Sequence, residues 1–592
     1  MQKRNLSKSS LFLLLAILFG FYACKTDPNN GNEKPEITKS STVTVRLRAE
    51  ADRLNPLLSW YGWSIHIMNF IFPTLLAYNP ETEELSPVLV KSRPEVIPIT
   101  EGPYDGGTKY SYELLEEATW ENGTPLTAKD YEFTLKVLFN PHVACEVYRQ
   151  ILSLIRDVEL DPENPRKYAV LTDEKYIKAE HATGLFILPE YVYDPEGLLK
   201  DYKVGDLTDP AQAEKHAADE NLKTFGEQFN SSKYSREKEY VSGAGAYKLD
   251  EWVSGERIVI VKKKNWWGDK LRDQNPLLTA YPEKMIFMPI ADPNTAISML
   301  KDQSIDVMDA IPEIQFLELK ENELVNQHYN FYAPDILGFY LLYLNTRIPK
   351  LEDKRVRRAL AHLFDVEEVL KSVKLDFGVP IVGPVHPTRS YYNKNLKPIE
   401  LDVEKARTLL KEAGWEDSNS NGTVDKNIDG ELLEMNLQYM ITPNNPTSNN
   451  IALIFKNEAR KAGVNIEIIT KEANVLRQDV KKRDFELFAG GAHQDMVDDP
   501  KQFWHTSSDT PNGSNRCGFG DAESDQLIEE IRRTLDEEKR GKLFLRLQEI
   551  IYEEQPAIFM YATKDRVAIH NRFKGVKLSL VSPRYFENYW YE

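Results

Sequence analysis

The chain has 592 residues, of which 41% are hydrophobic and 28% charged, and its formal net charge is −18. This length predicts several domains or one large lobed protein. The acidic excess argues against a nucleic-acid partner, which needs a basic face, and against a broad basic patch for anionic lipid. The three cysteines are Cys24, Cys145 and Cys517. If Cys24 is modified, the other two form one disulfide or stay unpaired.

Residues 1–23 have the pattern of a secretory signal peptide. Three basic residues within the first eight precede an apolar run over residues 11–22, and Ala23 stands directly before Cys24. The run of about 12 residues is shorter than the roughly 20 that a membrane-spanning helix needs. No later stretch is long and apolar enough to cross a membrane, so the rest of the chain is expected to fold in water.

A cysteine directly after a small residue resembles the processing site of bacterial lipoproteins. That resemblance implies that Cys24 becomes the new N-terminus and carries acyl chains, although Phe21 and Tyr22 are bulkier than the usual residues there. The alternative is an ordinary secreted protein with an incidental cysteine. Residues 24–41 contain few apolar side chains, which is typical of a flexible tether between an anchor and a folded body.

The first half of the body alternates short strands with helices. We expect strands at 42–47, 110–115, 247–249, 257–261 and 305–308, and helices at 64–76, 128–139 and 294–303. Thr127 stands three residues before Asp130, which gives the helix at 128–139 a start resembling a capping box. Trp120 comes before the turn at Asn122-Gly123 and is interpreted as a core residue.

The second half continues in the same way. We expect strands at 338–344, 432–440, 464–469 and 485–488, and helices at 353–370, 403–413, 448–462 and over most of 524–555. Gly414 and Gly463 follow two of these helices and are plausible C-caps. Mixed strands and helices without a fixed-period repeat predict an α/β protein.

Several segments of this body occur in a characteristic order. They are Leu54-Asn55-Pro56, WENGTPLTAKD at 120–130, GAGAY at 243–247, NWW at 265–267, LNT at 344–346, DKRVRRAL at 353–360, ARTLLKEAGW at 406–415 and Asp499-Pro500. Their joint order and spacing, from about residue 42 to the C-terminus, resembles the extracellular solute-binding proteins of the oligopeptide and dipeptide class, family 5. Members of that family serve ABC importers as substrate-binding lipoproteins.

The resemblance implies a two-lobed periplasmic-binding-protein type II fold. Lobe 1 would span 42–339 with an extra subdomain at about 86–234, lobe 2 would span 340–555, and 556–592 would return to lobe 1. The implied function is capture of a peptide-like solute between the lobes and delivery to the permease of the importer. The resemblance further implies a monomer without a cofactor, lipid-anchored and facing the periplasm, with exposure at the cell surface left open.

Family members of the peptide-binding kind hold the ligand's α-ammonium with an aspartate shortly before an Asp-Pro or Glu-Pro pair. Asp495 is the best match, although it lies one position farther from Pro500 than the family spacing, and Ala492 replaces the family's tryptophan. Asp498 is the second candidate. The same segment contributes His493.

Two further groups of residues extend the candidate ligand site. Gly490 and Gly491 lack a Cβ and could let a ligand approach the backbone, or they form an ordinary turn. Trp60, Tyr61 and Trp63 lie where family members line the cleft, and the alternative is that all three belong to the core.

The loop that follows Trp415 resembles the first half of a calcium-binding loop. Oxygen-bearing side chains stand at Asp417, Asn419, Asn421 and Asp425, but Ile428 occupies the position where a bidentate glutamate is expected. A polar surface turn is the main alternative, and no other metal site is predicted.

Catalysis has little support in the sequence. The chain has neither a Gly-x-Ser-x-Gly elbow nor a His-Glu-x-x-His motif, so we expect a binding protein that is not an enzyme. Three alternatives stay open: an outer-membrane glycan-binding lipoprotein of the starch-utilisation type, which would consist largely of helical repeats; a secreted hydrolase; and the same two-lobed scaffold with an oligosaccharide, a nickel complex or an opine as ligand.

Overall fold

The structure is a computed structural model that describes residues 41–592. The predicted signal peptide, Cys24 and nearly all of the predicted tether lie outside the described residues. Within 41–592, no helix combines the length and the apolar character that a membrane span requires.

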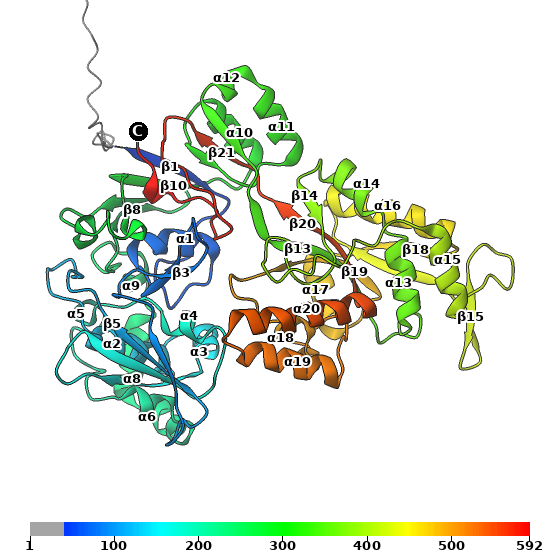
Figure 1. Cartoon of the computed structure of the whole chain (residues 1–592). Coiled ribbons are helices and arrows are strands. Elements are labelled where there is room, and N and C mark those ends of the chain that lie inside the picture. The colour runs from blue at the N-terminus through cyan, green and yellow to red at the C-terminus, as the bar shows by residue number, and fades with distance from the viewer. Residues whose placement is uncertain (1–40) are drawn as a thin grey trace, which may run out of the picture. The chain divides into compact units, whose positions relative to one another are not determined.

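A seven-stranded sheet forms the centre of what we call lobe 1 (Figure 1). Its strands in spatial order are β12 (Tyr329–Tyr332), β21 (Val567–His570), β11 (Val307–Met308), β1 (Thr42–Leu47), β10 (Lys284–Pro289), β9 (Arg257–Lys262) and β8 (Tyr247–Val253). β1 alternates Thr and Val, so that Val43, Val45 and Leu47 point into the core. The first and last parts of the chain therefore meet in one sheet.

A six-stranded sheet forms the centre of what we call lobe 2. Its strands in spatial order are β14 (Gly378–Pro380), β20 (Ala557–Lys564), β13 (Asp335–Leu344), β19 (Leu487–His493), β17 (Asn436–Ile441) and β18 (Asn465–Thr470). Alternate residues of β13 belong to different cores, because Leu342 and Leu344 pack in one hydrophobic cluster and Leu341 and Tyr343 in another. Both faces of this sheet are therefore covered.

Two short connections carry the chain between the sheets. β12 of lobe 1 leads into β13 of lobe 2 through residues 333–334, and β20 of lobe 2 leads into β21 of lobe 1 through residues 565–566. The connections lie side by side, since the Asp565 N–H donates to the carbonyl of Pro334 at 2.8 Å. The Asp565 carboxylate also accepts hydrogen bonds from Ala310 N–H at 3.0 Å and from Arg584 Nε at 2.8 Å. This double crossover is the geometry of a two-strand hinge.

A separate four-stranded antiparallel sheet packs within lobe 1. Its order is β4 (Glu95–Pro98), β5 (Thr108–Glu113), β7 (Lys167–Thr172) and β6 (Ile155–Leu160). Two small hairpins complete the strands: β2 (Leu76–Tyr78) with β3 (Leu85–Pro87), and β15 (Asp425–Ile428) with β16 (Glu431–Glu434).

The helices divide between the lobes. Those of lobe 1 are α1 (Gly62–Ile71), α2 (Ala128–Phe139), α3 (Glu146–Ile151), α4 (Ala179–Thr183), α5 (Glu190–Tyr193), α6 (Val204–Thr208), α7 (Ala213–Ala217), α8 (Glu220–Phe229), α9 (Lys233–Arg236), α10 (Pro293–Lys301), α11 (Glu313–Glu321) and α12 (Glu323–Asn326). Those of lobe 2 are α13 (Lys354–His362), α14 (Val366–Glu368), α15 (Val403–Glu412), α16 (Pro446–Lys461), α17 (Ala473–Lys482), α18 (Lys501–Trp504), α19 (Ala522–Arg533) and α20 (Glu537–Glu554).

Most predicted elements are confirmed. The helix at 128–139 has the predicted bounds, and Asp130 accepts hydrogen bonds from the Thr127 N–H at 2.8 Å and the Thr127 hydroxyl at 3.0 Å. Trp120 is buried, as predicted, and its Nε1 donates to the same carboxylate. Gly414 and Gly463 follow α15 and α16 with φ of 85° and 77°, values that glycine adopts without strain.

Several predicted elements differ in extent from the observed ones, and three of them end early or are divided. The helix expected at 64–76 ends at Ile71, because Phe72 precedes a proline and leaves the helical region. The helix expected at 353–370 breaks after His362, where Asp365 caps the next short helix through Glu368 N–H. The strand expected at 432–440 is divided between β16 and β17, since residues 431–434 turn back at Gly430 to pair with β15.

Cys145 and Cys517 are both free and buried, so the two thiols do not pair.

Candidate functional site

A cavity of about 1200 Å³ lies between lobe 1 and lobe 2. Lobe 1 contributes residues within 56–88, 148–154, 174–186 and 580–589, and lobe 2 contributes residues within 337–339, 384–385, 492–504 and 532–548. The volume exceeds the roughly 300–1,000 Å³ of ordinary small-molecule pockets, so an extended ligand can be enclosed.

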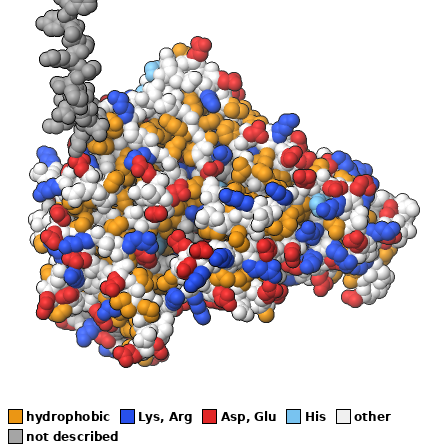
Figure 2. Space-filling model, in the orientation of Figure 1, with side chains coloured by type: hydrophobic (Ala, Val, Ile, Leu, Met, Phe, Trp, Pro, Cys, Tyr) orange, Lys and Arg blue, Asp and Glu red, His pale blue; other side chains and the backbone are white. Residues whose placement is uncertain are grey.

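The walls of the cavity are rich in aromatic side chains from both lobes. They are Trp60, Phe70, Phe72, Tyr78, Tyr148, Tyr176, Phe186, Tyr585, Phe586 and Tyr589 in lobe 1 and Phe339, Phe503, Trp504 and Phe544 in lobe 2. Aromatic rings offer large apolar contact area, and the tips of Tyr and Trp also form hydrogen bonds. These walls therefore suit a ligand with apolar groups. Figure 2 shows that on the outer face in view acidic and basic side chains are intermixed.

The segment from Ala492 to Trp504 is the longest continuous part of the lining. It leaves the sheet at His493, the last residue of β19. The strand places Gly490 and Gly491 against aromatic rings of β13: a Cβ on Gly490 would lie 3.2 Å from the Tyr343 ring, and one on Gly491 would lie 3.5 Å from the Tyr340 ring. The two glycines are thus strand residues that accommodate these rings, rather than a turn, and neither lines the cavity.

Asp495 lines the cavity and forms an ion pair across it with Lys178 of lobe 1. Its backbone carbonyl accepts a hydrogen bond from Arg389 Nη2 at 2.5 Å. Desolvation is the largest single influence on the pKa of Asp495 and raises it. The charge and the hydrogen bond of Lys178, together with two nearby histidines, lower the pKa by more than this, so the net pKa lies below its ordinary value. The carboxylate is therefore ionised and already has a cationic partner.

Asp498 lines the cavity wall but is almost fully buried. Its Oδ2 accepts hydrogen bonds from the Tyr391 hydroxyl at 2.6 Å and from Gln494 Nε2 at 3.0 Å. Burial raises the pKa of Asp498 to about 6, although the Tyr391 hydrogen bond and the nearby Arg389 oppose that rise. Asp498 thus belongs to a buried polar network of lobe 2.

Asp499 joins the lobes through a second set of contacts. Its Oδ2 accepts from the Tyr176 hydroxyl of lobe 1 at 2.8 Å and from Arg532 Nε of lobe 2 at 3.0 Å. The backbone of the same lobe 1 segment also takes part, since Ile177 N–H donates to the Arg532 carbonyl at 2.9 Å. Residues 176–178 therefore hold the lobes together beside the cavity.

The three aromatic candidates near the start of the chain have different surroundings. Trp60 lines the cavity, and its ring centroid lies 3.8 Å from that of Tyr148. Tyr61 is also exposed but is not part of the lining, and Trp63 stacks beneath the Arg48 guanidinium, 4.8 Å from ring centroid to Cζ. The structure thus brings Trp60, His493, Asp495 and Asp498 to one cavity.

His493 is exposed at the cavity, where desolvation lowers its pKa.

Sequence reasoning missed the lobe 1 residues that face these aspartates. Lys178 and Tyr176 precede α4, and the residue separation between Lys178 and Asp495 is 317. Glu587 and His66 form a buried pair in the same wall, with 2.9 Å between carboxylate and ring nitrogen. Arg584 also lines the cavity and pairs with Asp565 at the hinge. No local motif marks any of these residues.

In the loop that resembles a calcium site, the oxygen-bearing side chains accept hydrogen bonds from backbone N–H groups of the same loop. Asp417 accepts from the N–H groups of Asn421 at 3.0 Å and Gly422 at 2.9 Å, and Asn419 also accepts from Asn421 N–H. Asp425 is buried and accepts from Ser418. Among residues 41–592 no group of three or more His, Cys, Asp or Glu side chains is arranged to hold a metal ion.

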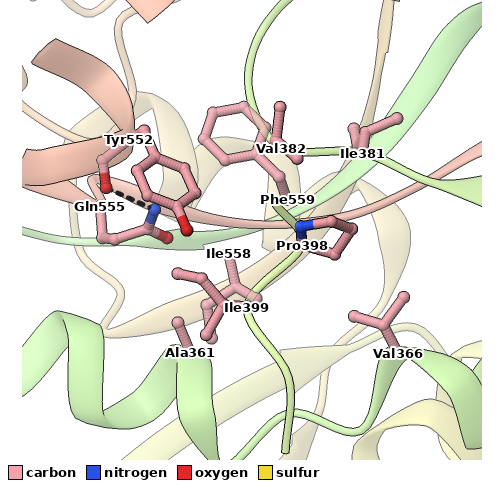
Figure 3. Close-up of a pocket in the computed structure, with 10 residues that line it drawn as sticks. All are labelled: Ala361, Val366, Ile381, Val382, Pro398, Ile399, Tyr552, Gln555, Ile558 and Phe559. Carbon is pink, nitrogen blue, oxygen red and sulfur yellow. Dashed lines mark hydrogen bonds between the residues drawn. The ribbon is translucent and has the colours of Figure 1, made fainter. Parts of the chain in front are cut away.

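A second, small pocket lies within lobe 2 (Figure 3). Its volume is about 20 Å³, close to the space that one water needs. Side chains such as Val366, Ile399 and Ile558 surround it, and Gln555 Nε2 donates to the Tyr552 carbonyl at its edge. We interpret it as a packing gap that is too small for a solute.

Comparison with known proteins places this architecture in a family. Residues 84–514 match the family described as bacterial extracellular solute-binding proteins, family 5 Middle. The oligopeptide-binding protein AppA of Bacillus subtilis is 23% identical over 588 residues, which cover 98% of this chain and 97% of AppA.

Solved structures share the fold at low sequence identity. The structure of AppA from Bacillus subtilis in complex with a nonapeptide has a TM-score of 0.66 at 20% identity and covers 94% of this chain and 99% of that one. NikZ from Campylobacter jejuni in complex with Ni(L-His) has a TM-score of 0.67 at 22% identity, with 93% and 99% covered. The predicted two-lobed type II fold is thereby confirmed, and its two sheets differ from the helical repeats expected of a starch-utilisation lipoprotein. The chain belongs to the bacterial extracellular solute-binding proteins, family 5.

Proposed function

We propose that this protein captures a peptide-like solute in the 1200 Å³ cavity and delivers it to the permease of an ABC importer. The observation that carries the proposal is the cavity itself, which both lobes line with aromatic side chains. AppA, which covers nearly the whole chain, is an oligopeptide-binding protein. An extended chain with apolar side chains matches both the size and the walls of the cavity.

The mechanism is a shift in population between lobe arrangements. A ligand that contacts both walls stabilises the arrangement in which they approach, and the paired connections at 333–334 and 565–566 absorb the change. The ligand contacts proposed from the sequence are Trp60, His493, Asp495 and Asp498, which line the cavity. Tyr61, Trp63, Gly490 and Gly491 are outside the lining and are weaker candidates.

The lobe limits are part of the proposal. The limits expected from the sequence place residues 335–339 in lobe 1 and residues 556–564 outside lobe 2. Membership of β13 and β20 in the six-stranded sheet argues for limits at 333–334 and 565–566 instead.

We place the protein at the cell envelope, held by acyl chains on Cys24, as a monomer that faces the periplasm. The support is the sequence pattern before Cys24, which lies outside the described residues, and membership of an extracellular family. Because the pattern resembles a lipoprotein site, attachment would follow from burial of the acyl chains in the bilayer.

Native mass spectrometry of the full chain tests the ligand class. The protein is offered an equimolar peptide library, maltooligosaccharides and Ni(L-His), and the retained masses are identified after buffer exchange. We expect retained peptides of unchanged mass, because the proposal includes no hydrolysis. Retention of only the oligosaccharides or only the nickel complex would replace the peptide proposal by the corresponding scaffold alternative, for which the NikZ complex is a precedent. Shortened peptides that accumulate with protein concentration would indicate a hydrolase.

A further inference from the structure

Lys178 and Asp495 form an ion pair that joins the two walls of the cavity. Lys178 comes from lobe 1, immediately before α4, and Asp495 comes from the lobe 2 segment that follows β19. Both residues line the cavity. The Lys178 side chain is about a quarter exposed and Asp495 about two thirds, at 25% and 64%, so the pair borders the enclosed space and is not part of the core.

The other carboxylates of this segment also have donors from the chain. Asp498 accepts from Tyr391 and Gln494, and Asp499 accepts from Tyr176 and Arg532. Of the remaining acidic residues in the lining, Glu587 has no exposed surface and pairs with His66, and Glu174 is exposed to water. Among the described residues, Glu174 is therefore the one acidic residue of the lining whose carboxylate has no hydrogen bond or ion pair, and every other carboxylate of the lining already has a partner.

The basic residues of the lining are likewise paired. Lys501 contacts Glu529 at 2.6 Å, Arg532 contacts Asp499 at 3.0 Å, and Arg584 contacts Asp565 at 2.8 Å. A charged ligand group that binds one of these paired side chains competes with the partner that the side chain already has.

An incoming ammonium group meets an unfavourable exchange at Asp495. It must lose its hydration to reach the carboxylate, and it releases the Lys178 ammonium, which then remains beside the cavity without that partner. One cation replaces another, so no charge pair is gained. A ligand end without charge leaves the Lys178–Asp495 pair intact and still contacts the aromatic walls. Such built-in competition is a means of discrimination between ligands.

We propose that Lys178 is a specificity-determining residue that occupies the cation position opposite Asp495, so that the protein selects solutes with no free amino group at that end. The inference rests on the proposed function and narrows its ligand class to N-acylated or otherwise uncharged peptide-like compounds. Asp495 then acts through Lys178 as a contact between the lobes, rather than as a direct ligand of an α-ammonium.

The test uses one peptide library in two forms, with free amino termini and with N-acetylated termini, offered together to the full chain. The variants are Lys178→Met, which removes the charge at similar length, and Lys175→Met as a matched control. Lys175 is an exposed lysine three positions away that does not line the cavity. Retained peptides are counted by mass spectrometry, and circular dichroism checks that each variant is folded.

We expect the unmodified protein and Lys175→Met to retain the acetylated form over the free form by about tenfold or more, the size of effect that a close charge pair can produce. Lys178→Met should lower this ratio by about tenfold, because Asp495 becomes available to a ligand ammonium. Equal or preferred retention of free amines by the unmodified protein, or an unchanged ratio in Lys178→Met, would overturn the inference. So would a folded Lys178→Met that retains neither form while the unmodified protein retains acetylated peptides. Retention of neither form by any variant would overturn the proposed function as well.

Discussion

Asp498 combines deep burial with two hydrogen-bond donors, and this combination determines its protonation. Its pKa of about 6 lies above the ordinary value of 3.8, so the unfolded chain releases this proton at lower pH than the folded protein does. The folded protein therefore binds more protons between these values, and stability falls as pH rises through them. The contribution of protonated Asp498 to the free energy of unfolding is fully present below about pH 3.8 and is lost as pH rises through about 6.

Asp498→Asn removes this titration. We expect the free energy of unfolding of the unmodified protein, relative to the variant, to fall by about 3 kcal/mol between pH 3 and pH 7, because each unit of pKa corresponds to about 1.4 kcal/mol. Urea unfolding at a series of pH values measures the difference. Asp105→Asn, at an exposed aspartate, is the control. A difference that does not vary with pH would show that folding does not raise the pKa of Asp498.

Trp60 and Tyr61 offer a matched pair of neighbouring aromatic residues. Their exposed fractions are 43% and 42%, yet only Trp60 lines the cavity. We expect Trp60→Ala to weaken the binding of a retained peptide by about 2 kcal/mol, which lowers its affinity roughly thirtyfold. A loss of this size is typical of a tryptophan anchor. Tyr61→Ala should leave the affinity within about twofold, because its ring is outside the cavity.

Isothermal calorimetry with a peptide recovered from the library gives both affinities, and thermal unfolding shows whether the variants remain folded. Equal losses in the two variants would remove Trp60 from the ligand site.

The residues of the site were predictable only in part. Asp495 and Asp498 could be nominated because they stand in a short segment before Pro500, which a single stretch of sequence reveals. Lys178 could not, since it meets Asp495 across 317 residues and from a different sheet. Gly490 and Gly491 suggested a turn, but their neighbours are the aromatic rings of β13, which pairing of distant strands brings into place.

The bounds of a helix or strand could be predicted from the sequence where the residues that determine them lie close together in the chain. The helix α2 has the predicted bounds because its capping residues lie within its first turn. The helix expected at 353–370 breaks because the Asp365 carboxylate caps a new helix, while the apolar periodicity continues across the break. The strand expected at 432–440 divides because hairpin pairing with β15 competes with the lobe 2 sheet.

Substitution of Asp130 measures how much the hydrogen bonds at the N-terminus of α2 contribute to the free energy of unfolding. Its carboxylate accepts hydrogen bonds from Thr127 N–H, the Thr127 hydroxyl and Trp120 Nε1 at 2.8, 3.0 and 3.2 Å. Asp130→Ala leaves these donors without their acceptor, and we expect a loss of about 1–3 kcal/mol in the free energy of unfolding. Lys129→Ala, at an exposed residue of the same turn, should change it by less than about 0.5 kcal/mol. Equal unfolding midpoints in urea for both variants would contradict this role.

At the scale of the whole molecule, the two lobes are joined in two different ways. The connections at 333–334 and 565–566 are covalent and hydrogen-bonded to each other, whereas residues 176–178 contact lobe 2 through side chains and one backbone hydrogen bond. Arg584 links the two regions, because it lines the cavity and pairs with Asp565 at the hinge. A ligand that contacts the cavity walls can therefore influence the hinge directly.

The proposed lipid anchor at Cys24 determines where the whole molecule is held. Cys24→Ser removes the thiol that would be acylated, so we expect the variant to fractionate with soluble proteins, whereas the unmodified chain stays with membranes through carbonate washing. The reason is the loss of acyl-chain burial, about 0.8 kcal/mol for each methylene group. Immunoblots of the two fractions, with Cys145→Ser as the control for loss of a thiol, measure the distribution. Membrane retention of Cys24→Ser would exclude the proposed anchor.

The proposed function requires that one solute is enclosed between the lobes and contacts both. Hydrogen–deuterium exchange of the full chain, with and without a peptide recovered from the library, tests it most directly. We predict slower exchange in residues 176–186 of lobe 1 and 492–504 of lobe 2 together, with the distant hairpin of β15 and β16 unchanged. Slower exchange confined to one lobe, or none in either segment while the peptide remains bound, would contradict binding of the solute between the lobes.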